Sequence, residues 1–460
     1  FAVPMLGAVL HTVNIRLAPA QIAYTIDHAE DDVILVHADF LPLMEEVMPL
    51  VKRKVRLILL RDDPAQDPEC SFDFVTSYDE MMAGPATDFE FPDFDEGTRA
   101  TTFYTTGTTG EPKAVAYSHR QLVLHTMGLL AGFGPIETSN RLHRGDVYMP
   151  ITPMFHVHAW GFPYAATLLG IKQVYAGRYT PANLLRLIAE EGATFSHCVP
   201  TILQMLLSAP EAADTDLSRL KMLIGGSALP RGLAESALAQ GINVYTGYGL
   251  SETCPVLTFA VLDPDDEADV EARLKTGNPL PLVDLQTVGA GMAELPRDGA
   301  STGEVVVRAP WLNAEYVKNP EATEALWEGD YLHTGDVGHI DASGALMITD
   351  RMKDVIKSGG EWVSSLELES LVSAVDGVAE VAAIGVQDDK WGERPVLLIV
   401  AREGAEEDAI KGGISAAAQQ AVAAGNLSKW AVPDQFRFVA EIAKTSVGKI
   451  DKKRLRAEFE

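Results

Sequence analysis

The sequence is poor in cysteine, and this scarcity limits the sites that it can form. Its 460 residues include only Cys70, Cys198 and Cys254, which are scattered and give no close pair for a metal or a redox couple. Disulfide-stabilised scaffolds are therefore excluded, and we expect a reducing, cytoplasmic location. Long apolar runs are also lacking, so we expect no membrane span. Internal repeats and low-complexity tracts do not occur either.

Positive charge is scarce as well. The chain has 37 Lys and Arg residues against 65 Asp and Glu, which gives a formal net charge of −28 at pH 7. Nucleic acids and anionic membranes are bound through clustered positive charge, so we expect neither as a partner. Anionic small molecules would need local basic or N–H-rich sites within this repelling field. The surplus of acid is typical of a chain that stays dissolved in saline surroundings.

The chain is long enough for more than one domain. Its 460 residues, 47% of them hydrophobic, can bury substantial cores, and the length favours two or more domains. Between residues 170 and 255, strand-like apolar runs alternate with amphipathic helical segments. Strands are predicted at 171–175, 194–199, 220–224 and 243–245, and helices at 181–191, 201–208 and 230–240. This α/β pattern predicts a largely parallel sheet with ligands beyond the carboxyl ends of its strands.

The pattern changes towards the C-terminus. Apolar runs at 305–307 and 346–348 predict short strands of a small β-rich subdomain within the large domain. Beyond these runs the sequence predicts a compact α/β unit, with helices at 365–375 and 415–424 and strands at 379–386 and 396–401. We therefore place a boundary between Asp350 and Arg351, with an N-terminal domain over residues 1–350 and a small C-terminal domain over residues 351–460.

Residues 105–113, Thr-Thr-Gly-Thr-Thr-Gly-Glu-Pro-Lys, are the most informative motif. Glycines allow a tight turn with N–H groups pointing inward, threonine hydroxyls add donors, and Lys113 supplies a cation. This is no Walker loop, because Pro112 separates the last glycine from the lysine and no hydroxyl follows. Strand-like runs on both sides disfavour a flexible linker. We expect a polyphosphate to contact Thr105, Thr106, Gly107, Thr108, Thr109 and Lys113.

Seven further motifs follow this loop. They lie at residues 154–161, 225–228, 248–253, 331–336, 350–354, 357–361 and 444–449. In content and order, the loop and these motifs resemble the adenylate-forming enzymes, which include acyl-CoA synthetases, carrier-protein adenylation domains and beetle luciferases. The resemblance covers nearly the whole chain. It implies that the C-terminal domain is mobile, and that the natural chain begins before Phe1, because residues 5–17 resemble a segment well inside the family's first domain.

The resemblance implies an ATP-dependent acid–thiol ligase. Such an enzyme joins a carboxylate to the α-phosphate of ATP, releases pyrophosphate, and transfers the acyl group to a thiol with release of AMP. ATP, Mg²⁺ and CoA are the expected cofactors, and a small carboxylic acid is the expected partner. An adenylation domain that loads a carrier protein is an alternative, and so is a catalytically silent binding module on the same fold. The sequence does not determine the oligomeric state, and a homodimer is the assembly that we consider.

The resemblance also assigns roles in adenine and phosphate binding. Tyr248 would stack on the adenine, and Thr253 would donate to the α-phosphate. The residues next to the adenine would be Gly226, Ser227 and Gly249.

Two further groups would hold Mg²⁺ and the ribose. Glu252 would bind Mg²⁺, since a hard cation prefers a carboxylate, and a solvated glutamate is the alternative. Asp336 and Arg351 would hold the ribose hydroxyls. Thr246 and Asp350 depart from the amide and the glycine that are usual at their positions.

Two lysines have expected roles in catalysis and domain movement. Lys449 would bridge the substrate carboxylate and the ribose or α-phosphate oxygens, since a compact ammonium on a long stem can engage and then leave. As an alternative, Lys449 would belong only to a basic C-terminal helix with Lys452 and Lys453. Lys353 matches the hinge of the family, and a surface lysine is the alternative.

Four residues indicate CoA as the thiol. Gly359 and Gly360 would let the backbone approach a pantetheine chain closely. Trp391 and Arg394 lie in a segment that resembles CoA-using members of the family. Gly359 and Gly360 would line a tunnel for pantetheine, and this tunnel and Lys449 cannot occupy one crevice together. The C-terminal domain is therefore expected to rotate between adenylation and thioester formation.

The acyl pocket is predicted from the motif at 154–161. Relatives that activate amino acids carry an aspartate after the phenylalanine, whereas this chain has His156, so a simple carboxylic acid is expected. The expected pocket residues are His156, Trp160, Gly161, Cys198, Pro200 and Gly225, and the catalytic candidates are Lys449, Glu252 and His156. Trp160 would shorten the pocket, or pack in the core as an alternative. The segment is most similar to medium-chain acyl-CoA ligases and to 3-methylmercaptopropionate-CoA ligases of marine bacteria, and the acidic composition favours the latter.

Overall fold

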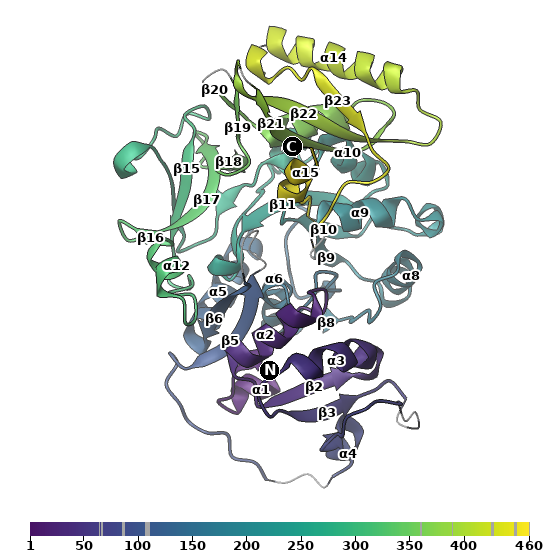
Figure 1. The fold of residues 1–460 in the computed structure, drawn as a ribbon, viewed down its shortest axis with the longest axis vertical. Helices are drawn as coiled ribbons and strands as arrows, with labels where there is room; N and C mark the ends of the chain where they lie inside the picture. Colours follow the sequence, from purple (N-terminus) through teal and green to yellow (C-terminus); the bar gives the residue numbers. More distant parts are fainter. Residues whose placement is uncertain are drawn as a thin grey trace. The chain divides into compact units, whose positions relative to one another are not determined.

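A computed structural model describes residues 1–63, 65, 68–84, 88–105, 111–358, 361–388, 390–424, 427–445 and 449–459. Figure 1 shows the chain and its elements. The fold divides into two compact units. The first comprises Phe1–Leu122, Met154–Val157 and Asn313–Thr323, and the second comprises Val123–Pro153, His158–Leu312 and Glu324–Glu460. In the described part of the chain, every helix is too short or too polar to cross a lipid bilayer.

The first unit contains two small sheets. One has the order β1-β5-β6, with β1 (Leu10–His11), β5 (Arg99–Thr105) and β6 (Lys113–Ser118). The other is parallel and has the order β2-β3-β4, with β2 (Val33–His37), β3 (Arg56–Leu60) and β4 (Thr76–Ser77). Its helices are α1 (Ala2–Met5), α2 (Pro19–Ala29), η1 (Ala38–Phe40), α3 (Leu41–Val47), η2 (Met48–Leu50), α4 (Tyr78–Ala83) and most of α12 (Pro320–Glu324). Ile22 and Ile26 lie on one face of α2 and pack with Leu57 and Leu59 of β3.

The second unit is built on a seven-stranded sheet with the order β13-β12-β11-β10-β9-β7-β8. Its strands are β7 (Val147–Tyr148), β8 (Lys172–Gln173), β9 (Phe195–Cys198), β10 (Lys221–Ile224), β11 (Asn243–Gly249), β12 (Val256–Phe259) and β13 (Asn278–Pro279). The helices around it are α5 (His119–Phe133), α6 (Val157–Trp160), α7 (Phe162–Leu169), α8 (Pro181–Glu191), α9 (Pro200–Leu207), η3 (Pro210–Asp214), α10 (Arg231–Ala239), η4 (Ser251–Thr253) and α11 (Val270–Leu274). Strands β7 to β11 pair in parallel, as the sequence predicts.

Alternation along the central strands explains why helices cover both faces of this sheet. In β10, Met222 and Ile224 belong to the core that α8, α9 and α10 close. Leu223 lies between them and belongs to the opposite core, with residues of α5 and α7. Because successive side chains of a strand point to opposite faces, a strand buried on both sides has an unbroken apolar sequence.

A smaller antiparallel sheet follows in the second unit. Its order is β14-β15-β17-β16, and β18 pairs with β17. The strands are β14 (Asp284–Val288), β15 (Gly303–Arg308), β16 (Trp327–Glu328), β17 (Tyr331–Ile340) and β18 (Leu346–Arg351), with η5 (Ala290–Met292) after β14. The predicted β-rich subdomain is therefore confirmed.

The C-terminal part is a sheet with the order β20-β19-β22-β21, and β23 pairs with β22. Its elements are β19 (Ile356–Ser358), β20 (Glu361–Val363), α13 (Ser365–Ser373), β21 (Val378–Asp388), β22 (Gly392–Ala401), α14 (Glu407–Ala423), η6 (Lys429–Ala431), β23 (Gln435–Phe438) and α15 (Lys452–Phe459). Val381 and Ala383 of β21 pack with α13 and α14, whereas Ala382 and Ile384 pack with Leu455 of α15. Figure 1 shows α14 lying along this sheet.

The predicted α/β class is right, but some boundaries are wrong. The strand predicted at 171–175 has only Lys172–Gln173, and the helix predicted at 415–424 begins at Glu407. The strand predicted at 243–245 is too short, because Tyr248 and Gly249 also lie inside β11. The reason is a change of partner: β11 pairs in parallel with β10 and then continues antiparallel to β12. The domain boundary at Asp350 and Arg351 stays a prediction, and it falls in the last peptide of β18.

Gly249 is the position at which the fold depends most on a missing side chain. A Cβ there would lie 1.8 Å from the carbonyl oxygen of Pro255, so we expect Gly249→Ala to lower the free energy of unfolding by about 1–3 kcal/mol or more. Gly412→Ala is the matched control, because a Cβ on Gly412 of α14 meets nothing within 4 Å. The control should be neutral or stabilising, by up to about 1 kcal/mol. Denaturant unfolding curves compare the two, and equal stability of both variants would contradict this packing.

Candidate active site

Gly225, Gly226 and Ser227 follow β10 directly, at the carboxyl end of a parallel strand. Gly226 has a φ of +80°, a conformation that favours glycine. A Cβ on Gly226 would lie 3.2 Å from Cε of Lys449 and 3.2 Å from Cγ1 of Val199. The missing side chain therefore lets Lys449 lie against the backbone at the end of the sheet. The structure thus brings together Gly226 and Lys449, two residues that the sequence assigned to one site.

Asp336 forms the anionic centre of this site. It lies on β17 opposite Arg351 of β18, and only 4% of its surface is exposed. The hydroxyl of Tyr248, on β11, donates to Oδ2 of Asp336 at 2.7 Å, and Nε of Arg351 lies 3.3 Å from Oδ1. Burial raises the pKa of Asp336, and Arg351 opposes this rise. Three predicted nucleotide-binding residues therefore converge through direct contacts.

Lys449 is the cation next to this carboxylate. Burial, together with the positive charge of Arg351, lowers its pKa to about 8, although Asp336 and Glu252 oppose the shift. The main chain of Lys449 is held by Thr445, whose N–H donates to the carbonyl of Lys449 at 2.7 Å. The N–H of Lys449 donates in turn to Oγ1 of Thr445 at 3.3 Å. Lys449 precedes α15, so it does not belong to the basic helix that was the alternative.

The η4 turn carries two more predicted residues. Glu252 acts electrostatically on Lys449 and Arg351, which places its carboxylate near both cations. Thr253 is fully buried, and its hydroxyl donates to the carbonyl of Leu250 at 3.1 Å and contacts that of Pro255. A bond from this hydroxyl to an α-phosphate would therefore require it to leave these carbonyls.

A metal ion at this site would rely on few protein ligands. Among the side chains that the structure describes, no group of three or more His, Cys, Asp or Glu is placed to hold a metal. Glu252 is a hard oxygen ligand, and Mg²⁺ commonly takes one or two carboxylates together with phosphate and water oxygens. The residues present fit such a site.

The predicted phosphate loop belongs to the first unit. Thr105 ends β5 and Lys113 begins β6, and the two residues lie opposite each other in the antiparallel pair. The ammonium of Lys113 lies 4.9 Å from the ring centre of Tyr316. Residues Thr106, Gly107, Thr108 and Thr109 lie outside the described residues.

Trp160 lies in an unusual turn. His158, Ala159 and Trp160 have φ values of 53°, 51° and 59°, and Gly161 follows at 77°. Left-handed turns without glycine cost about 1–2 kcal/mol per residue and are typical of functional sites. The indole of Trp160 is 5% exposed and stacks on His197 at 5.0 Å between ring centres. A Cβ on Gly225 would lie 3.0 Å from this indole, so Trp160 lies directly against the glycine edge.

The other predicted pocket residues are not all brought together. Cys198 belongs to the core on the α8–α10 side, with Sγ 3.7 Å from Sδ of Met222, whereas Trp160 belongs to the opposite core. Burial raises the pKa of the Cys198 thiol, so it is no reactive thiolate. Pro200 is buried at the first position of α9. His156 lies in a turn of the first unit.

Of the four predicted CoA residues, Trp391 and Arg394 are described by the structure. Gly359 and Gly360 lie outside the described residues. Arg394 donates to Oγ of Ser358, directly before these glycines, at 3.2 Å, and to the carbonyl of Trp430 at 2.8 Å. Trp391 packs on Trp430 with 4.8 Å between ring centres. Arg394 therefore connects the segment leading to the glycines with the turn at η6.

The predicted hinge residue, Lys353, is exposed in the turn after β18.

His197 is a residue of the site that the sequence did not reveal. Its Nε2 lies 2.6 Å from the hydroxyl of Tyr148, and its Nδ1 lies 2.9 Å from Oγ1 of Thr152. A lone histidine in an apolar strand carries no motif, so only the fold reveals that it supports Trp160.

Comparison with known proteins identifies the family. The model of the AMP-binding enzyme family matches residues 1–317, and that of the AMP-binding enzyme C-terminal domain matches residues 367–449. The chain belongs to the AMP-binding enzymes. The first of these matches covers more than half of the sequence, in agreement with the resemblance of the motifs.

Curated relatives of this AMP-binding enzyme are CoA ligases. A long-chain-fatty-acid–CoA ligase of Thermus thermophilus is 39% identical, with 100% of this chain and 82% of the relative covered. A 3-methylmercaptopropionyl-CoA ligase of Ruegeria pomeroyi is 38% identical, with 98% and 83% covered. A medium-chain-fatty-acid–CoA ligase of Ectopseudomonas oleovorans is 35% identical, with 100% and 83% covered. The predicted class is confirmed: the AMP-binding enzyme is an AMP-forming acid–thiol ligase that uses ATP and CoA.

Solved structures confirm the fold. An anthranilate CoA ligase in complex with anthranoyl-AMP superposes with a TM-score of 0.84 at 24% identity, with 98% of this chain and 83% of that chain covered. At this identity the likeness concerns the fold alone.

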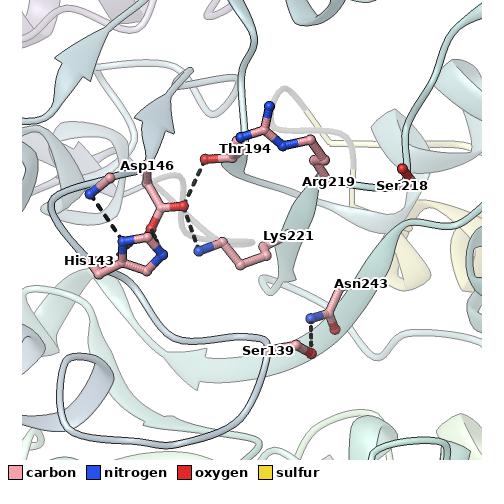
Figure 2. Close-up of a pocket in the computed structure, with 9 residues that line it drawn as sticks. Ser139, His143, Asp146, Thr194, Ser218, Arg219, Lys221 and Asn243 are labelled. Carbon is pink, nitrogen blue, oxygen red and sulfur yellow. Dashed lines mark hydrogen bonds and ion pairs between the residues drawn. The ribbon is translucent and has the colours of Figure 1, made fainter.

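The AMP-binding enzyme also has a pocket of about 360 Å³, lined by polar side chains, at the opposite end of the strands of its large sheet (Figure 2). Asp146 lines this pocket and accepts from Nζ of Lys221 at 2.6 Å and from Oγ1 of Thr194 at 2.7 Å. The N–H of His143 donates to the same carboxylate at 2.9 Å. These residues precede or begin β7, β9 and β10, at the amino ends of the strands. The network joins these strand ends, and no predicted site residue lines the pocket.

The charge of Lys449 should depend on Asp336. We expect competitive acetylation of the nucleotide-free enzyme, followed by mass spectrometry, to give Lys449 a pKa of about 8. Asp336→Asn should lower this pKa further, because the carboxylate raises it and the buried surroundings and Arg351 remain. The control Glu190→Gln, which alters an exposed pair with Arg186, should leave it unchanged. A pKa near the ordinary 10.5 of lysine, or a rise in Asp336→Asn, would contradict the site as described.

Proposed function

We propose that the chain converts 3-methylmercaptopropionate, ATP and CoA into 3-methylmercaptopropionyl-CoA, AMP and pyrophosphate through an acyl-adenylate. The observation that carries the first step is the position of Lys449 against Gly226, next to the Asp336 carboxylate. The relative from Ruegeria pomeroyi and the acidic composition support the substrate. A medium-chain fatty acid is the alternative, since the relative from Ectopseudomonas oleovorans is nearly as similar.

The nucleotide would be held where the seven-stranded sheet meets the smaller antiparallel sheet of β14 to β18. In the proposal, Asp336 accepts hydrogen bonds from the ribose hydroxyls and Arg351 donates to them. Each residue gives up part of its contact with the other when the sugar binds. Tyr248, which already donates to Asp336 at 2.7 Å, is fixed at its hydroxyl, so its ring is positioned to stack on adenine. Gly226 and Ser227 supply the backbone edge beside the base.

Lys449 would act in the chemical step. The substrate carboxylate attacks the α-phosphorus, the bond to the pyrophosphate oxygen breaks, and negative charge on the α-phosphate oxygens increases in the transition state. An ammonium that is already withdrawn from water interacts strongly with this charge and needs little reorganisation. Glu252 would hold Mg²⁺, which neutralises charge on the phosphates when bound. Residues 105–113, with Lys113, would hold the leaving pyrophosphate.

The acyl chain would end at Trp160. The indole is buried between His197 and the Gly225 edge, so a wall of fixed position would limit the length of the acid. A thioether would also gain a soft contact between its sulfur and the ring. Thioester formation would follow when rotation at Lys353 replaces Lys449 by the glycines at 359 and 360, so that the CoA thiol displaces AMP from the acyl-adenylate.

Replacement of Lys449 tests the proposed first step. Lys449→Ala should slow acyl-adenylate formation by roughly 10²–10³, because one preorganised charge-stabilising donor is lost. ATP binding and thermal stability should be nearly unchanged. The measurements are ATP–pyrophosphate exchange with 3-methylmercaptopropionate, isothermal titration with ATP, and a thermal melt. Lys453→Ala, in the same basic segment, is the control and should exchange normally. Near-normal exchange in Lys449→Ala would remove this lysine from the mechanism.

Replacement of Trp160 tests the proposed substrate. Trp160→Ala should favour an acid two carbons longer by roughly tenfold in kcat/KM, since each added buried methylene contributes about 0.8 kcal/mol. It should also weaken use of the thioether acid. AMP release is measured across propionate, butyrate, hexanoate, octanoate and 3-methylmercaptopropionate with CoA present. Trp311→Ala is the control: Trp311 is fully buried, so its loss should lower stability by about 3–5 kcal/mol without changing the order of acids. An unchanged order in Trp160→Ala would contradict the wall.

A further inference from the structure

The end of β18 is bonded to the first turn of α13. Asp350 is 2% exposed, and its Oδ2 accepts from the N–H of Ser365 at 2.7 Å and from the hydroxyl of Ser365 at 2.6 Å. Ser364 caps the helix and its hydroxyl donates to the carbonyl of Thr349. A carboxylate at a helix N-terminus is favoured by both the free N–H groups and the helix dipole. Asp350 therefore fixes α13 to the strand that also carries Arg351.

The same hydroxyl continues the network to the C-terminal helix. Nζ of Lys452 donates to Oγ of Ser365 at 2.5 Å and lies 2.8 Å from Oε1 of Glu369. The Glu369 carboxylate also accepts from the N–H of Ala383 at 2.9 Å. The side chains of Lys452 and Glu369 are only 9% and 12% exposed. Since Ser365 donates to Asp350 and accepts from Lys452, it joins the two halves of the network.

Lys452 begins α15, one short segment after Lys449. The N–H of Asp451 donates to the carbonyl of Ala443 at 2.9 Å, and Leu455 packs in the core beneath α15. Fixing Lys452 therefore fixes the start of the helix and the direction from which Lys449 extends to Gly226.

We propose that Ser365 is a positioning residue for Lys449. Ser365 transmits the fixed position of Asp350 on β18 to Lys452 and so holds Lys449 at the site of acyl-adenylate formation. This inference rests on the proposed function of Lys449. Asp350 precedes the predicted hinge at Lys353, whereas Ser365 and Lys452 follow it. Rotation at Lys353 would break the Asp350–Ser365 bonds and leave the pair of Lys452 and Glu369 intact. The network therefore supports the first half-reaction and not the second.

The test separates the two half-reactions in Ser365→Ala. Acyl-adenylate formation, measured by ATP–pyrophosphate exchange, should fall roughly 10- to 100-fold, the scale of one hydrogen bond to a charged group. Thioester formation from synthetic acyl-adenylate and CoA should stay within about twofold of the wild-type rate. The matched control is Ser373→Ala on the same helix, whose hydroxyl donates only to the carbonyl of Ser370, at 2.7 Å, and it should change neither rate. An equal loss in both half-reactions would overturn the inference.

A double variant distinguishes positioning from general destabilisation. If Ser365 acts through Lys449, Ser365→Ala should cost at most about twofold when Lys449 is already alanine. A full loss in that background as well would mean that Ser365 acts elsewhere, and would overturn the inference.

A further readout needs no catalysis. The N–H groups of Lys449, Asp451 and Leu455 are hydrogen-bonded, so their exchange with deuterium reports how firmly this segment is held. Exchange should be faster in Ser365→Ala and unchanged in Ser373→Ala. If the wild-type enzyme activated no acid, the proposed function would fail, and faster exchange would still support the anchoring of Lys449. Unchanged exchange in Ser365→Ala would overturn the inference.

Discussion

The site depends on one constraint: an ammonium must be kept charged while its neighbours withdraw it from water. Transfer of an unpaired ammonium from water is costly, and the cost falls when fixed anions and hydrogen bonds replace the lost solvent. Asp336 and Glu252 supply the anions next to Lys449, and Gly226 supplies space because it has no side chain. The pKa of about 8 means that these anions offset only part of the effect of burial on Lys449. An additional anion would therefore stabilise its charged form further. In the proposed function, a nucleotide phosphate is such an anion, and this local site would bind it within a chain of net charge −28.

The sheets of the second unit determine where these groups meet. The parallel half of β11 ends beside Gly225 and Gly226, which directly follow the neighbouring strand β10, and β11 then continues with β12 as its antiparallel partner. Tyr248 lies in the part of β11 that pairs with β12, and its ring packs with Leu285 and Val305 of the smaller antiparallel sheet. Its hydroxyl then reaches Asp336 on β17. One continuous strand thus links Gly225 and Gly226 to the ion pair of Asp336 and Arg351.

The sequence predicts many of the helices and strands of the second unit well. Hydrophobic periodicity and the proline and glycine residues at helix ends are local features of the sequence. The helix over Pro181–Glu191 begins at a proline and ends before a glycine, and both signals are visible without the fold. The sequence does not predict that β11 continues beyond Tyr245. This part of the strand pairs with β12, which lies downstream, and no local pattern indicates that pairing. The position of Cys198 was missed for a different reason: alternation directs it away from Trp160, although both lie in motifs of one predicted pocket. The Asp350–Ser365–Lys452 network joins distant residues of ordinary type, and only the three-dimensional arrangement reveals it.

In the proposed function, Lys449 contacts the reacting nucleotide. A crystal structure of the chain with a non-hydrolysable acyl-sulfamoyl adenosine, a stable analogue of the acyl-adenylate, would locate this contact. We expect Nζ of Lys449 within hydrogen-bond distance of the ribose or of the sulfamoyl group, with Asp336 on the ribose hydroxyls and Gly226 beside the base. A structure in which the analogue occupies another pocket, or in which Asp336 and Arg351 stay paired away from the sugar, would contradict it.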